Sequence, residues 1–417
     1  MPTDRTTTLE QSALVALATG LGLIQLTIFG WVPLLVAGVL WFLLFKQDGF
    51  RGSVPSFFWP LVALAAWTLV SCAFSSEPGA SFFRSRQLLF YLLVPLTLRV
   101  ARGPAAMRVL DVIIAVGAFS ALAGVVEYAF MNYRSMGARP SGFLGHYMTF
   151  SGVIMLVLCG AFARLVFRSR EWIWPAVAVP ALLAALVVSE ARNAWLGALA
   201  AIVVLLSLRS WKLLVAVPIL VAVLAILAPG IARNRAKSIF DPSDPTNRDR
   251  IAMLESGRLM IEDHPLVGVG MNMVPKEYSA KYKTADAVDP PDKPGDTRAH
   301  LHNVPVQLAA ERGLPALAAW AWLIVVAARD LLRLVRRSTT PAIAATGLAA
   351  LVAMIISGLF EYNIGHTEFL VLFLALISLP FAAESAPRPP DATGLSVPVL
   401  VGGGPSRSAH SAAGHGL

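Results

Sequence analysis

The sequence predicts an all-α polytopic membrane protein with about twelve transmembrane helices. Of its 417 residues, 56% are hydrophobic and only 14% are charged, and the mean hydropathy is +0.66. A soluble domain does not bury so large an apolar fraction. Apolar stretches of about 17–24 residues, long enough to cross the hydrocarbon core as helices, recur along the chain. Their centres lie near Leu21, Val39, Ala65, Leu93, Gly117, Leu156, Leu182, Ile202, Val221, Leu323, Leu351 and Leu372.

The first apolar run is expected to be a retained helix. The N-terminal residues MPTDRTTTLEQ contain no basic region of the kind that precedes a signal peptide, and no A-x-A cleavage site clearly follows. This run meets the second at GWVP, residues 30–33, which predicts a tight helical hairpin. The two cysteines, Cys72 and Cys159, lie in apolar segments, so neither a disulfide nor a thiolate metal site is expected.

The distribution of basic residues predicts how the helices are oriented, because short cytoplasmic loops carry an excess of Lys and Arg. The net charge of +9 is therefore attributed to orientation, and no nucleic-acid partner is expected. Both termini are expected in the cytoplasm, together with the loops that carry Lys46, Arg51, Arg99, Arg102, Arg108, Arg164, Arg168, Arg170, Arg209, Lys212, Arg329, Arg333, Arg336 and Arg337. The outward-facing connections then hold Arg84, Arg86, Arg134, Arg139, His146, Glu190, Arg192 and residues 361–366.

These assignments divide the chain into four parts. Residues 1–229 form nine transmembrane helices, 230–303 a long outer loop with an amphipathic helix, and 304–383 three further spans. Residues 384–417 are rich in Pro, Gly, Ser and Ala and are predicted to be a disordered cytoplasmic tail. A loop of about 70 residues is unusual in a compact protein and is often functional.

The outer loop contains one strong helix signal. Thr246 and Asp249 resemble a capping box, and His264, followed by Pro265 and Gly268, ends the helix. Projection at 100° per residue puts Arg250 on the same face as the apolar and small residues of this helix, which are Leu254, Gly257 and Ile261. A charge on a face that packs against the membrane domain is costly without a partner. Arg250 either forms a salt bridge or extends to solvent, or it binds an anion in a cavity.

The segment HLHNVPVQLAAERG, residues 300–313, predicts a second functional element. His302 and Asn303 precede Pro305, which suits a first helical turn, and Gly-Leu-Pro after residue 312 predicts a kink. The helix dipole disfavours a charged imidazole at this position, so His302 is a candidate general base. The alternative is that His302 only caps the helix. His300 is expected to be exposed or to have a secondary, orienting role.

Arg192 lies in VVSEARNAWLG, between two apolar spans joined by almost no loop. An arginine buried at the start of a membrane helix is costly and indicates function. The alternative is a structural ion pair with Glu190.

In four segments the chain resembles the bacterial O-antigen ligases, which share a fold superfamily with O-antigen polymerases and protein O-oligosaccharyltransferases. HLHNVPVQLAAERGLPAL is similar to the H-N-x9-G motif, and SEARNAWLG resembles the S-x-R segment. NRDRIAMLESGRLMIEDHPLVGVGMN looks like the pattern of an arginine, a helix and Pro-x-x-Gly-x-Gly, and PSGFLGHYMTFSG resembles the G-x-x-G-H segment. The chain departs from some ligases at Ala316, where they have Gly, Thr or Tyr.

The resemblance implies a metal-independent, inverting glycosyltransferase of the GT-C type in the bacterial inner membrane, without a cofactor. It implies transfer of an O-antigen chain from undecaprenyl diphosphate to lipid A-core on the periplasmic face. The family's catalytic histidine corresponds to His302, and its diphosphate-binding arginines to Arg192 and Arg250. Possible supporting residues are His300, Asn303, Arg139, His146, Arg84 and Arg86.

The residue chemistry is compatible with this assignment. Glycosyl transfer needs a base for the acceptor hydroxyl and positive charge for the departing diphosphate, and arginine forks match phosphate oxygens. No acidic cluster marks an outer loop as a metal site, and no Walker-type motif predicts ATP hydrolysis. The outward arginines Arg84, Arg86, Arg134 and Arg139 either steer the donor or contact anionic lipid headgroups.

Three glycosyl transfer reactions share this chemistry. The chain is expected to be a ligase, with polymerase and protein O-oligosaccharyltransferase as alternatives, because only the acceptor separates them. A transporter or flippase is an alternative of another class. It is disfavoured because no internal repeat is evident and most ionisable residues lie at span ends, with Asp111 and Glu127 as exceptions.

Overall fold

The computed structural model describes residues 4–49, 54–134, 139–168, 171–228, 230–237, 241, 243–284, 287 and 300–385. All regular structure in these ranges is helical. Arg51, Arg170, the side chain of Arg134 and the predicted tail beyond Ser385 lie outside the described residues.

The chain folds into consecutive helices. The first half comprises α1 (Asp4–Leu23), η1 (Ile28–Gly30), α2 (Trp31–Asp48), α3 (Phe58–Ala73), α4 (Pro78–Ser85), η2 (Arg86–Leu92), α5 (Leu93–Val100), α6 (Pro104–Arg134), α7 (Tyr147–Val166) and α8 (Ile173–Val188). The second half comprises α9 (Arg192–Arg209), η3 (Trp211–Val215), α10 (Ala216–Leu227), α11 (Gly230–Lys237), α12 (Pro245–Asp263), α13 (Val274–Glu277), η5 (Tyr278–Tyr282), α14 (Val304–Arg337), α15 (Pro341–Gly358), η6 (Asn363–Gly365) and α16 (Thr367–Glu384).

The apolar composition of the helices confirms a polytopic membrane protein. Six of the described helices are long and apolar enough to cross a bilayer: α6, α7, α9, α14, α15 and α16. Four shorter apolar helices fall at Trp31–Gln47, Phe58–Ala73, Ile173–Val188 and Trp211–Leu227. The count of twelve spans stays a prediction.

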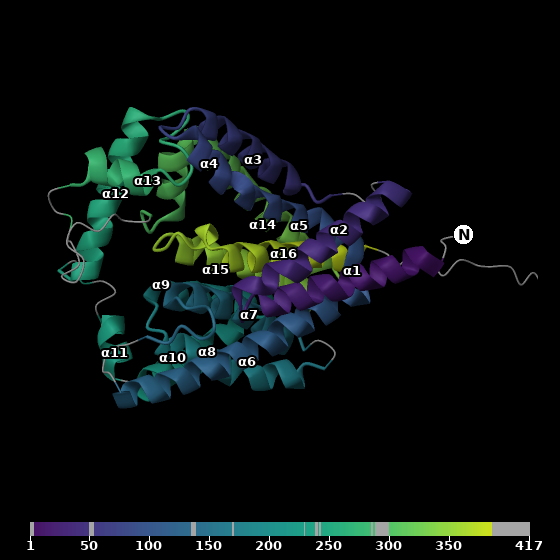
Figure 1. Cartoon of the computed structure of the whole chain (residues 1–417). Helices are drawn as coiled ribbons and strands as arrows, with labels where there is room; N and C mark the ends of the chain where they lie inside the picture. The colour runs from purple at the N-terminus through teal and green to yellow at the C-terminus, as the bar shows by residue number, and fades with distance from the viewer. Residues whose placement is uncertain are drawn as a thin grey trace, which may run out of the picture. The chain divides into compact units, whose positions relative to one another are not determined.

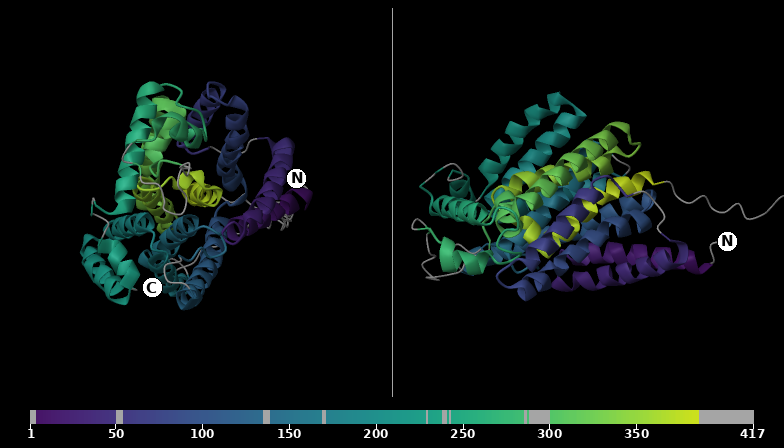
Figure 2. Two further views of the ribbon diagram at one scale, coloured as in Figure 1. Left: turned by 60° about the vertical axis from the view of Figure 1, so that its left-hand side comes forward. Right: turned by 90° about the horizontal axis from the view of Figure 1, so that it is seen from above.

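The centre of the bundle is formed by the most buried spans, α7, α15 and α16. α15 packs against α7, α9, α14 and α16, and α16 lies in the middle of the surrounding helices (Figure 2). The predicted N-terminal hairpin is present, since α1 packs along α2. A Cβ atom at Gly30 would lie 2.3 Å from the backbone nitrogen of Ile24, so the tight connection requires glycine there.

The segments predicted to face outward meet at one end of the bundle, which we call the α12 end. α12 and α13 lie at this end in both views (Figures 1 and 2). Contacts join the loops: Ser81 donates a hydrogen bond to the Met271 carbonyl, and Gln87 donates to the carbonyls of Ile364 and Gly365. Helix termini expected on the cytoplasmic side meet elsewhere, as in the Ser338–Glu384 contact.

The predicted kink in α14 is confirmed at Gly313, whose φ of +80° and ψ of 170° are not helical. The kink exposes carbonyl groups that the Pro265–Gly270 segment satisfies. The amides of Val269 and Gly270 each donate a 2.8 Å hydrogen bond, to the carbonyls of Ala310 and Glu311. This docking fixes α12 relative to the start of α14 and so sets the geometry of the residues that both helices carry.

Two glycines permit the docking. A Cβ atom at Gly313 would lie 1.9 Å from the Leu266 carbonyl oxygen, and one at Gly268, with φ of +66°, would lie 2.3 Å from the Glu311 carbonyl carbon. Backbone atoms rather than flexible side chains occupy both places. Backbone packing therefore explains Gly268, the first glycine of the Pro-x-x-Gly-x-Gly pattern.

Replacing Gly313 with alanine is expected to destabilise the protein. The positive φ alone costs about 1–3 kcal/mol in a residue with a Cβ atom, and the overlap with Leu266 adds to that cost. We expect a lower melting temperature and a smaller monodisperse fraction in detergent. Gly38→Ala is the control, because nothing lies within 4 Å of its Cβ position in α2. Equal melting temperatures for the two variants would contradict the docking.

Candidate active site

The short break between α8 and α9 positions Arg192. Glu190 has a φ of +53°, and Arg192 begins α9 with a buried side chain. Its Nη2 atom lies 3.4 Å from Oδ1 of Asp244, while Glu190 pairs with Arg139 at 3.8 Å. Arg192 and Arg139 therefore each have a carboxylate partner on another segment.

α12 begins earlier than the sequence indicated. Asp244 is its N-cap, with Oδ1 accepting hydrogen bonds from the amides of Thr246 and Asn247. The predicted capping box of Thr246 and Asp249 is therefore wrong, because Asp244 followed by a proline already provides a cap and a first turn. Asp244 also pairs with Arg192, so this one carboxylate connects α12 to α9.

The buried stripe of α12 is rotated from the predicted one. Met253, Ser256, Gly257 and Met260 are buried, whereas Leu254 is 37% exposed. A Cβ atom at Gly257 would lie 2.4 Å from Val306, so glycine brings α12 close to α14. The face with Arg250 and Leu254 does not pack down on the membrane domain as expected.

Arg250 and Leu254 instead line a cavity of about 270 Å³ at the α12 end. Arg192 and His302 line the same cavity, so the structure brings together the three principal residues proposed from the sequence. The remaining wall is largely apolar and is formed by Leu196, Ile251, Leu301, Leu359 and Phe360, beside Asn193, Asp241 and Asn247.

Arg250 forms no hydrogen bond or ion pair with any described residue. Burial lowers the pKa of its guanidinium, which Glu361 opposes and the neighbouring Arg192 reinforces. Its free donors and the proximity of Arg192 concentrate positive charge on this side of the cavity. The salt-bridge interpretation of Arg250 finds no support among the described residues.

His302 does not cap α14. Asn303 is the N-cap: its Oδ1 accepts from the Val306 amide at 2.9 Å, and its Nδ2 donates to the Leu359 carbonyl at 2.9 Å. His302 has a φ of +50°, a left-handed conformation that β-carbon sterics disfavour. This turn frees the imidazole for a contact outside α14, and the capping alternative is therefore wrong.

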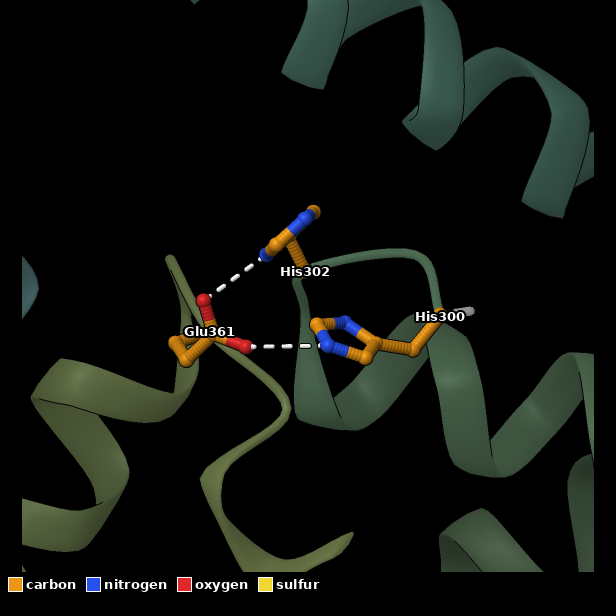
Figure 3. Close-up of side chains that lie close together, drawn as sticks. All are labelled: His300, His302 and Glu361. Carbon is orange, nitrogen blue, oxygen red and sulfur yellow. Dashed lines mark hydrogen bonds and ion pairs between the residues drawn. The ribbon is translucent and has the colours of Figure 1, made fainter. Parts of the chain in front are cut away.

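The contact of His302 is Glu361, a residue that the sequence interpretation missed. Nδ1 of His302 lies 2.7 Å from Oε2 of Glu361, and Nε2 of His300 lies 3.4 Å from Oε1 (Figure 3). The Glu361 side chain is 1% exposed. Burial alone would raise the pKa of its carboxyl, but His302, His300 and His366 together lower it to about 2. The sequence did contain one signal that could have identified Glu361: it is an acidic residue in a short turn between two apolar spans.

The ionised carboxylate fixes the tautomer of the neutral His302 ring. A carboxylate only accepts hydrogen bonds, so Nδ1 carries the proton and Nε2 keeps a free lone pair. Figure 3 shows Nε2 on the edge of the ring away from Glu361. This arrangement leaves His302 able to remove a proton from a group in the cavity.

His300 supports this arrangement rather than pointing to solvent. Its ring centroid lies 4.3 Å from that of His302, and burial lowers its pKa to about 4. The expectation that His300 is exposed is wrong, because it contacts the same carboxylate as His302. The rings of His146 and His366 stack on each other with centroids 5.8 Å apart, and the His366 centroid lies 6.3 Å from that of His300, so these four histidines form one cluster.

Arg139 and His146 lie on the loop that precedes α7, close to these histidines. Glu127 anchors this loop through hydrogen bonds from the amides of Ser141 and Gly142. The guanidinium of Arg139 lies 4.5 Å from the Tyr147 ring centroid. Glu127 therefore has a structural role in holding this loop. It was one of the two ionisable residues away from span ends, so it no longer favours a transporter.

Arg84 and Arg86 are not brought to the cavity. Arg86 packs over the ring of Phe83, with its Cζ atom 3.9 Å from the ring centroid, and neither arginine is among the cavity residues. Asn303 is also absent from the cavity wall. Its side chain caps the start of α14 instead.

The fold and the cavity define a polytopic membrane protein with two arginines and a carboxylate-oriented histidine around one cavity. Residues 176–321 match the family model described as O-antigen ligase, so this part of the chain is similar to that family. The matched range contains Arg192, Arg250 and His302, but not Glu361. No curated protein matches the chain. The family match indicates an enzyme of the broad ligase or polymerase kind, acting on lipid-linked polysaccharide.

Proposed function

We propose that the chain is an O-antigen ligase, which transfers O-antigen polysaccharide from undecaprenyl diphosphate to a sugar hydroxyl of lipid A-core. The observation that carries this proposal is the shared cavity of Arg192, Arg250 and His302, with Glu361 behind the histidine. The family match supports the reaction class. The arginine distribution predicts that the α12 end faces outward, and the resemblance to O-antigen ligases implies that this side is the periplasm and that the bundle lies in the inner membrane.

The proposed reaction is a direct displacement with inversion. Nε2 of His302 accepts the proton of the acceptor hydroxyl as its oxygen attacks the anomeric carbon. The bond to the diphosphate breaks on the opposite side, and its electron pair leaves with the diphosphate oxygen. Arg192 and Arg250 stabilise that developing charge, and Glu361 stabilises the imidazolium. The large membrane helices and this chemistry suit a GT-C-type glycosyltransferase.

Metal independence follows from the assignment of the diphosphate charge to the arginines. Divalent ions commonly perform that task, but here two guanidinium groups occupy the cavity wall. We expect EDTA to leave the transfer rate of purified protein unchanged, with donor and acceptor in detergent. A rate that falls with EDTA and returns with Mg²⁺ or Mn²⁺ would contradict the proposed mechanism.

Glu361→Gln is expected to reduce the transfer rate by at least about 100-fold, the scale of general-base catalysis. The amide allows the other His302 tautomer and no longer stabilises the imidazolium. Glu361→Asp keeps the charge and should retain more activity. Rates are compared at equal amounts of folded protein, and full activity of Glu361→Gln would show that the carboxylate has no part in the reaction.

A deletion strain tests the proposed acceptor. Loss of a ligase leaves free lipid A-core beside long carrier-linked chains. Loss of a polymerase instead leaves lipid A-core capped by single repeats, and loss of a protein O-oligosaccharyltransferase leaves lipopolysaccharide intact. Only the first pattern, restored by the chain but not by its His302→Ala variant, agrees with the proposal.

A further inference from the structure

The histidine pair and its carboxylate form a compact set of metal ligands on one side of His302. His300, His302 and Glu361 each offer one ligand atom, and these three atoms lie within 4.8 Å of one another. The individual separations are 2.7 Å from His302 to Glu361 and 3.4 Å from His300 to Glu361. Ligands of a tetrahedral zinc ion lie about 3.3 Å apart, given bonds of about 2.0 Å. Small side-chain shifts therefore suffice to bring all three onto one ion.

The donor types select the kind of ion. Two imidazoles and one carboxylate are a common zinc ligand set, whereas Mg²⁺ prefers oxygen ligands in an octahedral arrangement. The His300 and His302 side chains are 18% and 22% exposed, so an ion has access from solvent. A water molecule can complete the tetrahedron.

We propose that His300, His302 and Glu361 form an inhibitory zinc site that inactivates the enzyme when occupied. This inference rests on the proposed role of His302 as the base. Coordination through Nδ1 moves the single proton of the neutral ring to Nε2, which then donates and no longer accepts. Zinc also takes the Glu361 carboxylate that would stabilise the imidazolium.

The location of the ligand set distinguishes inhibition from catalysis by the metal. Neither His300 nor Glu361 lines the cavity, and the donor nitrogen of His302 faces Glu361 (Figure 3). The ion would therefore lie behind the imidazole, whereas Arg192 and Arg250 lie in the cavity wall. A metal in that position is badly placed to bind the leaving diphosphate.

The test uses the full-length protein, purified in detergent and stripped with EDTA. Zinc binding is measured by competition with a fluorescent zinc indicator, and transfer is measured at the same free Zn²⁺ concentrations. We expect one zinc ion per chain, a transfer rate that falls as the site fills, and recovery when EDTA is added. Mg²⁺ at the same concentrations should have no effect.

Two matched histidine variants locate the site. His300→Asn should weaken zinc binding more than about tenfold, and the concentration for half-inhibition should rise by the same factor. The zinc affinity and the concentration for half-inhibition are each measured within one variant. A change in the basal transfer rate of that variant therefore does not alter either value. His264→Asn, which removes a histidine at the end of α12 outside this ligand set, should bind zinc and be inhibited like the wild type.

The possible outcomes distinguish failure of the zinc site from failure of the proposed reaction mechanism. Absence of zinc binding, or equal inhibition of wild type and His300→Asn, would overturn the inhibitory site while leaving the reaction mechanism intact. Activity that is lost in EDTA and restored by zinc would overturn both the inhibitory role and the metal-free mechanism. An active His302→Ala variant would overturn the proposed base, even if zinc still binds.

Discussion

Removal of the His302 imidazole is expected to reduce polysaccharide transfer about 10²- to 10⁴-fold, the usual contribution of a positioned general base. Nε2 of this ring faces away from Glu361, and His302 lines the cavity with both arginines. His302→Asn is the best first variant, because asparagine tolerates the φ of +50° better than alanine does. Transfer is measured as carrier-linked polysaccharide converted to lipid A-core-linked product.

Chemical rescue separates a catalytic role from a structural one. His302→Gly also fits the left-handed backbone and leaves space beside Glu361. Added imidazole should restore part of the transfer rate of this variant, and the restored rate should saturate with imidazole concentration. The His264→Ala variant should transfer at the wild-type rate. High activity of His302→Asn without imidazole would rule out His302 as the base.

The sequence alone predicted the membrane class, the kink and three residues of the candidate site, because each depends on local signals. Apolar length predicts spans, the Gly-Leu-Pro segment predicts the kink at Gly313, and isolated charges at helix ends stand out in an apolar chain. Arg192 and Arg250 were selected by the cost of burying a charge, and His302 was selected by its place at a helix N-terminus. Their meeting in one cavity depends on the docking of Pro265–Gly270 onto the kinked α14, which no local pattern reveals.

The role of Glu361 could not be predicted from local sequence signals. Glu361 is separated from His302 by 59 positions, and its role becomes visible only when α15 and α14 are packed together. The helix caps were misassigned for a related reason: Asp244 lies two positions from Thr246, and Asn303 lies one position from His302. The stripe of α12 was misassigned for a different reason: the spacing of about 100° per residue gives the angles between its side chains but not which face packs against α14.

Arg250→Ala is expected to reduce the transfer efficiency, kcat/KM, about 10²- to 10³-fold, as does loss of one donor that stabilises a developing oxyanion. Its guanidinium lies in the cavity wall beside Arg192 and has no partner among the described residues. Arg250→Lys keeps the charge without the planar fork, so it should recover only part of the efficiency. Arg248 provides the matched control: it lies two residues earlier on α12, is exposed, and is not in the cavity wall. Arg248→Ala should retain wild-type efficiency.

Thermal stability then distinguishes binding from structural roles of Arg250. A structural ion pair would make Arg250→Met less stable, since its partner would be left buried and uncompensated. A cation held ready for a substrate anion is itself unfavourable when the cavity contains no anion, so Arg250→Met should have an equal or higher melting temperature. Lower activity together with undiminished stability would identify a group arranged for substrate. A lower melting temperature for Arg250→Met than for Arg248→Met would instead show that Arg250 mainly supports the fold.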